Sequence, residues 1–137
     1  MWCTIQPAMK KIKTSSDLAS AGARQVMQET TAEQGVQNLK EAITLDPFQT
    51  DARIALGRFF MRNGKPGDAE RTFKQAIEID PMMPDSYLYL GDDYIVLNNL
   101  QASLENFRMY LDLKPNAKNR KAVETKIRQI TIPKRRR

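Results

Sequence analysis

Apolar residues recur at helical spacing through the middle of this 137-residue chain. Within residues 50–83, Leu56 and Phe60 lie on one face of a predicted helix, and Phe73 lies on the matching face of a second. Pro81 ends the second helix, because proline cannot continue a helix and biases the preceding residue toward an extended conformation. The stretch therefore predicts two helices joined by a turn.

The same pattern returns after 34 residues in both directions. Shifted forward, Gly57 falls on Gly91 and Phe73 falls on Phe107; shifted back, the match is weaker, and Gly57 falls on Ala23. A proline closes each of the three units, at Pro47, Pro81 and Pro115. A fixed period of this length, with helical spacing inside it, is typical of an array of helix-turn-helix units.

Small residues recur at three places in the units, where two helices can approach closely: Ala23, Gly57 and Gly91; Gly35, Ala69 and Ser103; Ala42 and Ala76. We therefore expect Gly57 and Ala69 to touch across the helix pair of the middle unit. Tyr110 departs from the pattern, since it stands where the third unit should carry a small residue.

This arrangement resembles the tetratricopeptide repeat, in which leucine-glycine and tyrosine mark the first helix, alanine, phenylalanine and alanine mark the second, and a proline closes the unit. The resemblance covers roughly residues 16 to 117 and is closest in the middle unit, at Leu56, Gly57, Phe60, Ala69, Phe73, Ala76 and Pro81. It implies an all-α fold, a right-handed α-α superhelix of about three repeats plus a C-terminal capping helix. In similar proteins the first helices line a groove for an extended peptide or a helix.

The domain organisation follows from this register. We expect a tail at 1–14, a repeat domain at 15–131 and a basic tail at 132–137; the repeats span about 16–49, 50–83 and 84–117, and the capping helix spans 117–130. The helices are expected at about 15–29, 31–45, 50–62, 65–79, 84–97 and 100–113. In the capping helix, apolar residues available to cover the last repeat are Ala122, Val123, Ile127 and Ile130.

Local residues set the helix ends. Residues Ser15 to Asp17 are expected to cap the first helix, and Thr31 with Gln34 three positions later forms a predicted capping box for the second. Gly64 and, one repeat later, Asn98 tolerate the left-handed conformation that ends a helix.

Composition excludes several kinds of chemistry. The chain has no histidine and one cysteine, Cys3, so we expect no disulfide framework, no His/Cys metal site and no Ser-His catalysis. The adjacent acids Asp92 and Asp93 should point in different directions on a helix, and we predict no enzyme activity and no cofactor. No secretory signal and no membrane-spanning run is visible, so a cytoplasmic protein is expected. Trp2 is interpreted as docking on the chain's own core; the alternative is a contact with a partner or a second subunit.

The net charge of +6 belongs to the C-terminal end. Residues 114–137 contain ten basic residues and one acid, a balance of +9, whereas the rest contains twelve basic and fifteen acidic residues, a balance of −3. Such an end can attract nucleic acid, anionic lipid or an acidic protein, can serve as a nuclear address, or can be a solvated cap. Its segment lacks aromatic residues for base stacking, which favours the solvated cap.

The register also predicts which residues of the first helices face the groove. They are Asp17, Ser20, Arg24, Met27 and Gln28; Asp51, Ile54, Arg58, Met61 and Arg62; and Asp85, Leu88, Asp92 and Ile95. Arg24 and Arg58 share one position and Arg62 lies a turn beyond, giving a basic strip beside apolar side chains. Such a strip suits a ligand with acids and apolar anchors.

Three functions remain open at this stage. The chain is interpreted first as a scaffold that binds a peptide or helix of another protein, then as a module for self-assembly, and then as a nucleic-acid or anionic-membrane adaptor acting through its basic end. Chaperone-binding relatives hold a C-terminal carboxylate with lysine and asparagine of the first unit. Here those positions carry Ser20 and Arg24, so that ligand is not expected.

Overall fold

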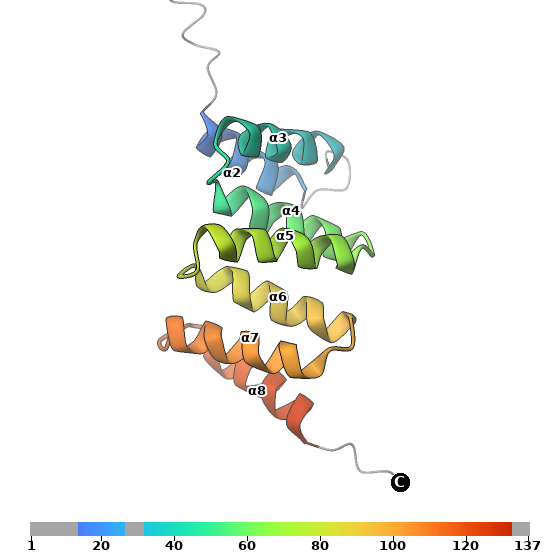
Figure 1. Ribbon diagram of the computed structural model, residues 1–137, viewed down its shortest axis with the longest axis vertical. Helices are drawn as coiled ribbons and strands as arrows, with labels where there is room; N and C mark the ends of the chain where they lie inside the picture. The colour runs from blue at the N-terminus through green and yellow to red at the C-terminus, as the bar shows by residue number, and fades with distance from the viewer. Residues whose placement is uncertain (1–13, 27–31, 133–137) are drawn as a thin grey trace, which may run out of the picture.

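The computed structural model describes residues 14–26 and 32–132, which form an elongated stack of helices (Figure 1). The helices are α2 (Ser15–Gln25), α3 (Ala32–Leu45), α4 (Thr50–Arg62), α5 (Pro66–Ile79), α6 (Pro84–Val96), α7 (Leu100–Leu113) and α8 (Arg120–Thr131). The described ranges contain no β-strand. The predicted all-α repeat fold is confirmed.

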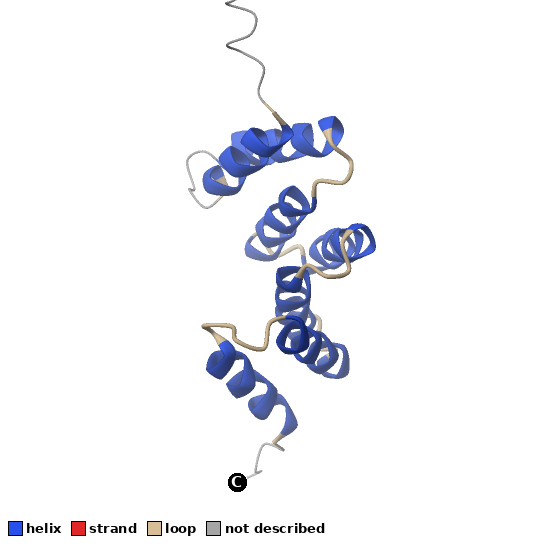
Figure 2. Cartoon of the chain, turned by 90° about the vertical axis from the view of Figure 1, so that its left-hand side faces the viewer, coloured by secondary structure: helices blue, strands red, loops and turns tan. Residues whose placement is uncertain are grey.

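The stack has two layers. In Figure 1 the second helices of the units, α3, α5 and α7, lie nearer the viewer, and the first helices, α2, α4 and α6, lie behind them. Each first helix packs against its own second helix, and α5 also packs against α6 of the next unit. Contacts between α2 and α4, and between α4 and α6, join the first helices into one layer. Figure 2 shows the stack from the side.

Turn residues end the helices as the sequence predicts. Gly64 and Asn98 have positive φ angles of 69° and 57°, which end α4 and α6. Glycine adopts this conformation without a Cβ clash, and asparagine tolerates it. The second helices α3, α5 and α7 each stop two residues before the proline of their unit.

Two expected helix ends need correction. Thr14, rather than Ser15 to Asp17, caps α2: its hydroxyl accepts from the Asp17 amide while the Asp17 carboxylate accepts from the Thr14 amide. The helix also ends at Gln25, four residues earlier than expected. The predicted capping box depends on Thr31, which lies outside the described residues, so it stays a prediction.

Close approach of the two helices in a unit depends on a glycine and an aromatic ring. A Cβ built on Gly57 would lie 2.5 Å from Cε1 of Phe73, and one built on Gly91 would lie 2.7 Å from the Phe107 ring. The three atoms nearest to such a Cβ on Gly57 all belong to the Phe73 ring. The expected contact between Gly57 and Ala69 stays a prediction. Phe73 and Phe107 are fully buried, so each ring fills the space that its glycine leaves.

The first unit is one residue longer between its two helices. A Cβ on Gly22 would lie 2.7 Å from Leu39, so Gly22 takes the place that Gly57 has against Phe73. Leu39 follows Gly22 by 17 positions, whereas Phe73 follows Gly57 by 16 (39 − 22 against 73 − 57). The structural counterpart of Arg58 is therefore Ala23. The prediction that Arg24 and Arg58 share one position is wrong by one residue.

The end of the stack differs from the expected cap. α8 begins at Arg120 and not at 117, because Ala117 is buried in the preceding turn, where its amide donates to the Lys114 carbonyl. Val123 is the one buried residue of α8, and Ala122 is exposed although it was expected to cover the last repeat. Tyr110 fills the space between α7 and this turn.

Candidate functional site

The predicted groove residues of α4 fall into two groups. Ile54 is only 7 % exposed and belongs to the core, and Met61 is half-buried against the same core. Arg58 and Arg62 reach the surface. The Arg58 guanidinium lies 4.7 Å from the centroid of the Tyr89 ring on α6, and Arg62 lines a hollow with Val26, Ala32, Phe59 and Asn63. The two arginines therefore mark the α4 part of the candidate site.

The predicted groove residues of the first unit do not extend this basic strip. Arg24 is exposed on α2 but lies one position beyond Ala23, the counterpart of Arg58. Asp17 is engaged in the capping box of α2, and Ser20 is exposed. Met27 and Gln28 lie outside the described residues.

One hollow lies at the start of α6. We call it the basic hollow, and its lining comprises Asp85, Leu88, Tyr89, Tyr110, Lys114, Asn116, Lys118 and Asn119. Asp85 and Leu88 were predicted as groove residues; the others come from α6, α7 and the α7–α8 turn. The Tyr110 hydroxyl donates to Asn119 Oδ1 over 2.7 Å, which leaves the Asn119 amide nitrogen as a donor.

A second hollow lies at the opposite end of α6. We call it the apolar hollow, and its lining comprises Ile95, Asn98, Leu100, Lys126, Gln129, Ile130 and Ile132. Ile95 was predicted to face the groove. It is 39 % exposed, Leu100 is 41 % exposed and Ile132 is 57 % exposed. Exposed aliphatic side chains gathered around one hollow are a candidate docking surface.

An ion pair lies between the two hollows. Lys126 Nζ on α8 is 2.6 Å from Asp92 Oδ1 on α6, and it also lies 5.6 Å from the centroid of the Phe107 ring. Asp92 is the remaining predicted groove residue of the third unit. The pair joins α8 to α6, so the site continues from the repeats onto the last helix. We call the surface that carries both hollows and this pair the α6–α8 face.

Asp93 has an entirely different environment from Asp92. Its side chain is fully buried, and neither carboxylate oxygen has a hydrogen-bond partner. Burial raises the pKa of Asp93 to about 6, and the negative charge of Glu70 adds to the rise. The two adjacent acids point in different directions, as the sequence predicts, and only Asp92 belongs to the α6–α8 face.

Sequence reasoning missed the part of the site that α8 and its preceding turn supply. Had the 34-residue shift been continued past the third unit, Asp85 would have fallen on Asn119, Asp92 on Lys126 and Ile95 on Gln129. All three line the hollows. Treating the last helix as a solvated cap concealed this signal.

Metal-binding groups and membrane-spanning helices were both sought among the described residues. In the ranges 14–26 and 32–132, no group of three or more His, Cys, Asp or Glu side chains could hold a metal ion. No helix in these ranges is both long enough and apolar enough to cross a membrane. The interpretation of Trp2 concerns a residue outside them.

Sequence comparison identifies the repeat. The family model described as tetratricopeptide repeat matches residues 26–82, which is less than half of the chain. The matched stretch is a tetratricopeptide repeat. The predicted family is confirmed, and the match lies on the second helix of the first unit and the whole middle unit. No curated protein matches the sequence.

Solved structures share the tetratricopeptide repeat fold. The first such domain of Spaghetti (RPAP3), bound to the HSP90 peptide SRMEEVD, superposes with a TM-score of 0.76 at 16% identity, over 86% of this chain and 90% of that one. The Arabidopsis OM64 TPR domain superposes with a TM-score of 0.74 at 22% identity, over 85% of this chain and 95% of that one. YrrB, described as having an unusual peptide-binding site, superposes with a TM-score of 0.69 at 19% identity, over 84% of this chain and 59% of that one. These likenesses establish the fold.

Proposed function

We propose that this chain is a protein-interaction domain that binds a peptide segment of a partner protein across α4 and the α6–α8 face. One observation carries the proposal: Leu88, Asp92 and Ile95, predicted from the repeat register to face the groove, follow one another along α6 at the basic hollow, the ion pair and the apolar hollow. Arg58 and Arg62 extend this surface along α4.

The solved neighbours support the general activity. The Spaghetti domain holds a peptide of HSP90, so the same fold accommodates a short acidic peptide in that protein. The ligand of this chain is a different one, because the first-unit positions that hold a C-terminal carboxylate in chaperone-binding relatives carry no lysine or asparagine here. The sequence period assigns Ser20 and Arg24 to these two positions. The packing of Gly22 on Leu39 shifts the alignment by one residue and assigns Ala19 and Ala23 to them.

The α4 arginines are arranged to contact such a ligand. Arg58 is held over Tyr89, which also lines the basic hollow, so a guanidinium lies beside an aromatic and aliphatic surface. Guanidinium groups recognise carboxylates with two parallel hydrogen bonds, and a stacked guanidinium has less freedom to lose on binding. We therefore expect Arg58 to contribute more to binding than an exposed arginine elsewhere.

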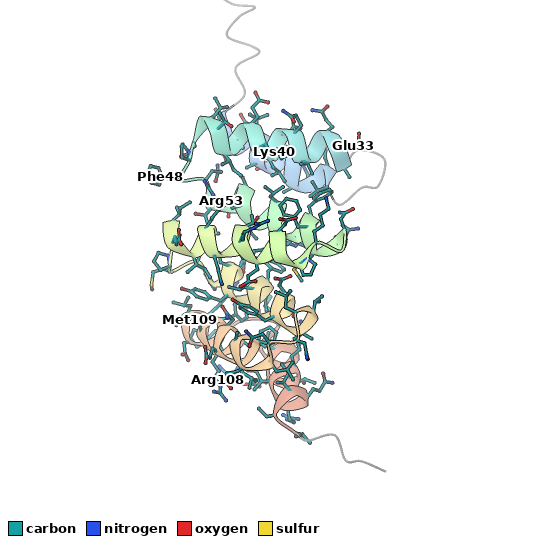
Figure 3. All side chains as sticks on the ribbon, turned by 45° about the vertical axis from the view of Figure 1, so that its right-hand side comes forward. Glu33, Lys40, Phe48, Arg53, Arg108 and Met109 are labelled. Carbon is teal, nitrogen blue, oxygen red and sulfur yellow. The ribbon has the colours of Figure 1, made fainter. Side chains whose placement is uncertain are left out.

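Selection of peptides on the folded chain tests the proposal. Twelve-residue peptides enriched from a random library would be synthesised, and their affinities compared between the wild type and the double variant Arg58→Glu/Arg62→Glu. We expect the reversal to lower affinity at least tenfold, since charge pairs at an interface become repulsive. The matched control is Lys40→Glu/Arg108→Glu, which makes the same charge change on the second-helix layer (Figure 3).

The control must bind as the wild type does, and circular dichroism must show unchanged helical content in both variants. Failure to enrich any peptide, or an equal loss of affinity in both double variants, would contradict the proposal. Self-assembly and binding through the basic end stay predictions. Concentration-dependent mass tests the first, and deletion of residues 133–137, which keeps Ile132 of the apolar hollow, tests the second.

A further inference from the structure

We infer that the α6–α8 face recognises an extended peptide that carries an apolar side chain and an acidic side chain about four or five residues apart, the acid in the basic hollow and the apolar group in the apolar hollow. This inference rests on the proposed function and specifies the chemistry of its ligand. It follows from the difference between the basic and the apolar hollow and from the Lys126–Asp92 ion pair that lies between them.

The basic hollow favours an acid because its two lysines form no salt bridge with the residues that the structure describes. Lys114 and Lys118 are exposed, and neither forms a salt bridge with any described residue. The one acid of the lining is Asp85, so the charges of the lining sum to +1. Asn119 adds an amide donor, because its oxygen is already occupied by Tyr110. Two cations and a neutral donor around one hollow complement a carboxylate.

The apolar hollow favours an aliphatic or aromatic anchor. Its lining includes four aliphatic side chains, from Ile95, Leu100, Ile130 and Ile132, and its one charged group, Lys126, is neutralised by Asp92. Ile95, Leu100 and Ile132 keep a third or more of their surface exposed, so an anchor placed between them would remove apolar area from water.

The ion pair sets the form of the ligand. Lys126 Nζ lies 2.6 Å from Asp92 Oδ1, so the pair bridges the space between α8 and α6. A ligand that reaches both hollows must therefore lie across the pair. From Asp85 to Ile95 is ten residues of α6, or about 15 Å at 1.5 Å per residue. An extended chain covers this distance in about four or five residues at roughly 3.3 Å each.

Peptide display separates this inference from the proposed function. Two twelve-residue libraries are selected on the wild-type chain, one with the peptide C-terminus joined to the display protein and one with it free. We expect enrichment from the joined library, with an Asp or Glu four or five positions from a large apolar residue, in either order. An amidated synthetic peptide of the enriched sequence is then measured against the variants by fluorescence anisotropy.

Two double variants test the contribution of each hollow to binding. Lys114→Glu/Lys118→Glu should weaken the peptide about tenfold, less at high salt because the lysines are exposed. Ile95→Ser/Ile132→Ser should weaken it by a similar factor, and by much less when the apolar residue of the peptide is replaced by alanine. The control, Lys121→Glu/Arg128→Glu, makes the same charge change at exposed positions of α8 outside both hollows and should leave the affinity unchanged.

Three outcomes would overturn the inference. The enriched peptides could lack the acid and apolar pair, enrichment could occur only in the library with a free C-terminus, or the Lys121 and Arg128 control could weaken binding equally. Each of these outcomes leaves the proposed function standing if Arg58→Glu/Arg62→Glu still lowers the affinity at least tenfold. A failure to enrich any peptide would contradict both the inference and the proposed function.

Discussion

Lys126 lies one repeat length after Asp92, and the two side chains form an ion pair that joins α8 to α6. Aligned positions of successive repeats lie near one another because each repeat stacks on the one before. α8 thus occupies the place of the first helix of a fourth unit. The polar cap of the stack is also part of its candidate binding surface.

The ion pair should hold α8 in place. The Lys126 and Asp92 side chains are 39% and 27% exposed, so solvent screens the pair and its contribution is modest. We expect Lys126→Met to lower the free energy of unfolding by about 1 kcal/mol, and to speed amide hydrogen exchange in α8. A double-mutant cycle with Asp92→Asn measures the coupling. Lys121→Met, on the exposed side of the same helix, should have no such coupling.

The contact between Gly57 and Phe73 should not tolerate even one methyl group. A Cβ at 2.5 Å from the buried ring forces the ring or the backbone to move. We expect Gly57→Ala to destabilise the protein by about 1–3 kcal/mol in urea unfolding. Gly67→Ala is the matched control, since a Cβ there meets nothing within 4 Å, and it should be neutral or stabilising. Equal stabilities of the two variants would refute the packing described here.

Asp93 should make the folded protein more stable as the pH falls from about 6 toward 4, opposite to the usual effect of a carboxylate. Burial raises its pKa from 3.8 in the unfolded chain to about 6 in the folded protein, so the folded state binds the proton more tightly. The cost of burying the charge is therefore full above about pH 6 and is relieved as the pH falls toward 4. A raised pKa of this size corresponds to about 3 kcal/mol at most.

Comparison with Asp93→Asn isolates this effect from all other acids. The stability of the variant relative to wild type should be greatest near pH 7.5 and should fall by about 1–3 kcal/mol as the pH drops to 4. The constant cost of burying an amide in place of the acid does not alter this slope. Thermal unfolding at a series of pH values measures it, and a relative stability independent of pH would mean that Asp93 is not buried as a charged group.

Removal of α8 should expose the end of the core. Phe107 is fully buried and Tyr110 is 2% exposed, and both pack with Ala117 and Val123. A chain ending after Pro115 should therefore associate or lose solubility, which light scattering detects. A chain that lacks only residues 133–137 is the control and should remain as soluble as wild type.

Much of the repeat core could be predicted because glycine, aromatic and proline positions are set by local geometry. Gly64, Asn98 and the three prolines determine helix ends directly, and α4 has the predicted bounds, Thr50 to Arg62. The first unit could not be aligned by a constant period, since its additional residue lies between Gly22 and Leu39. Only the packing of Gly22 on Leu39 identifies the true register.

The site was predictable only in part. Leu88, Asp92 and Ile95 follow from the register, but Ile54 shows that a groove position can be buried by its neighbours. The hollows depend on how α8 lies against α6, and this depends on Tyr110. That side chain occupies a place expected for a small residue, and its hydroxyl binds Asn119. A contact between residues of different helices cannot be read from a period.

A titration of the isotope-labelled chain with a selected peptide, followed by NMR, tests the central claim most directly. Binding across the α6–α8 face predicts shifts of the amide signals at Leu88, Ile95, Lys118, Asn119 and Ile130, while Lys40 and Arg108 on the second helices stay unchanged (Figure 3). Shifts confined to α3, α5 and α7 would contradict the account.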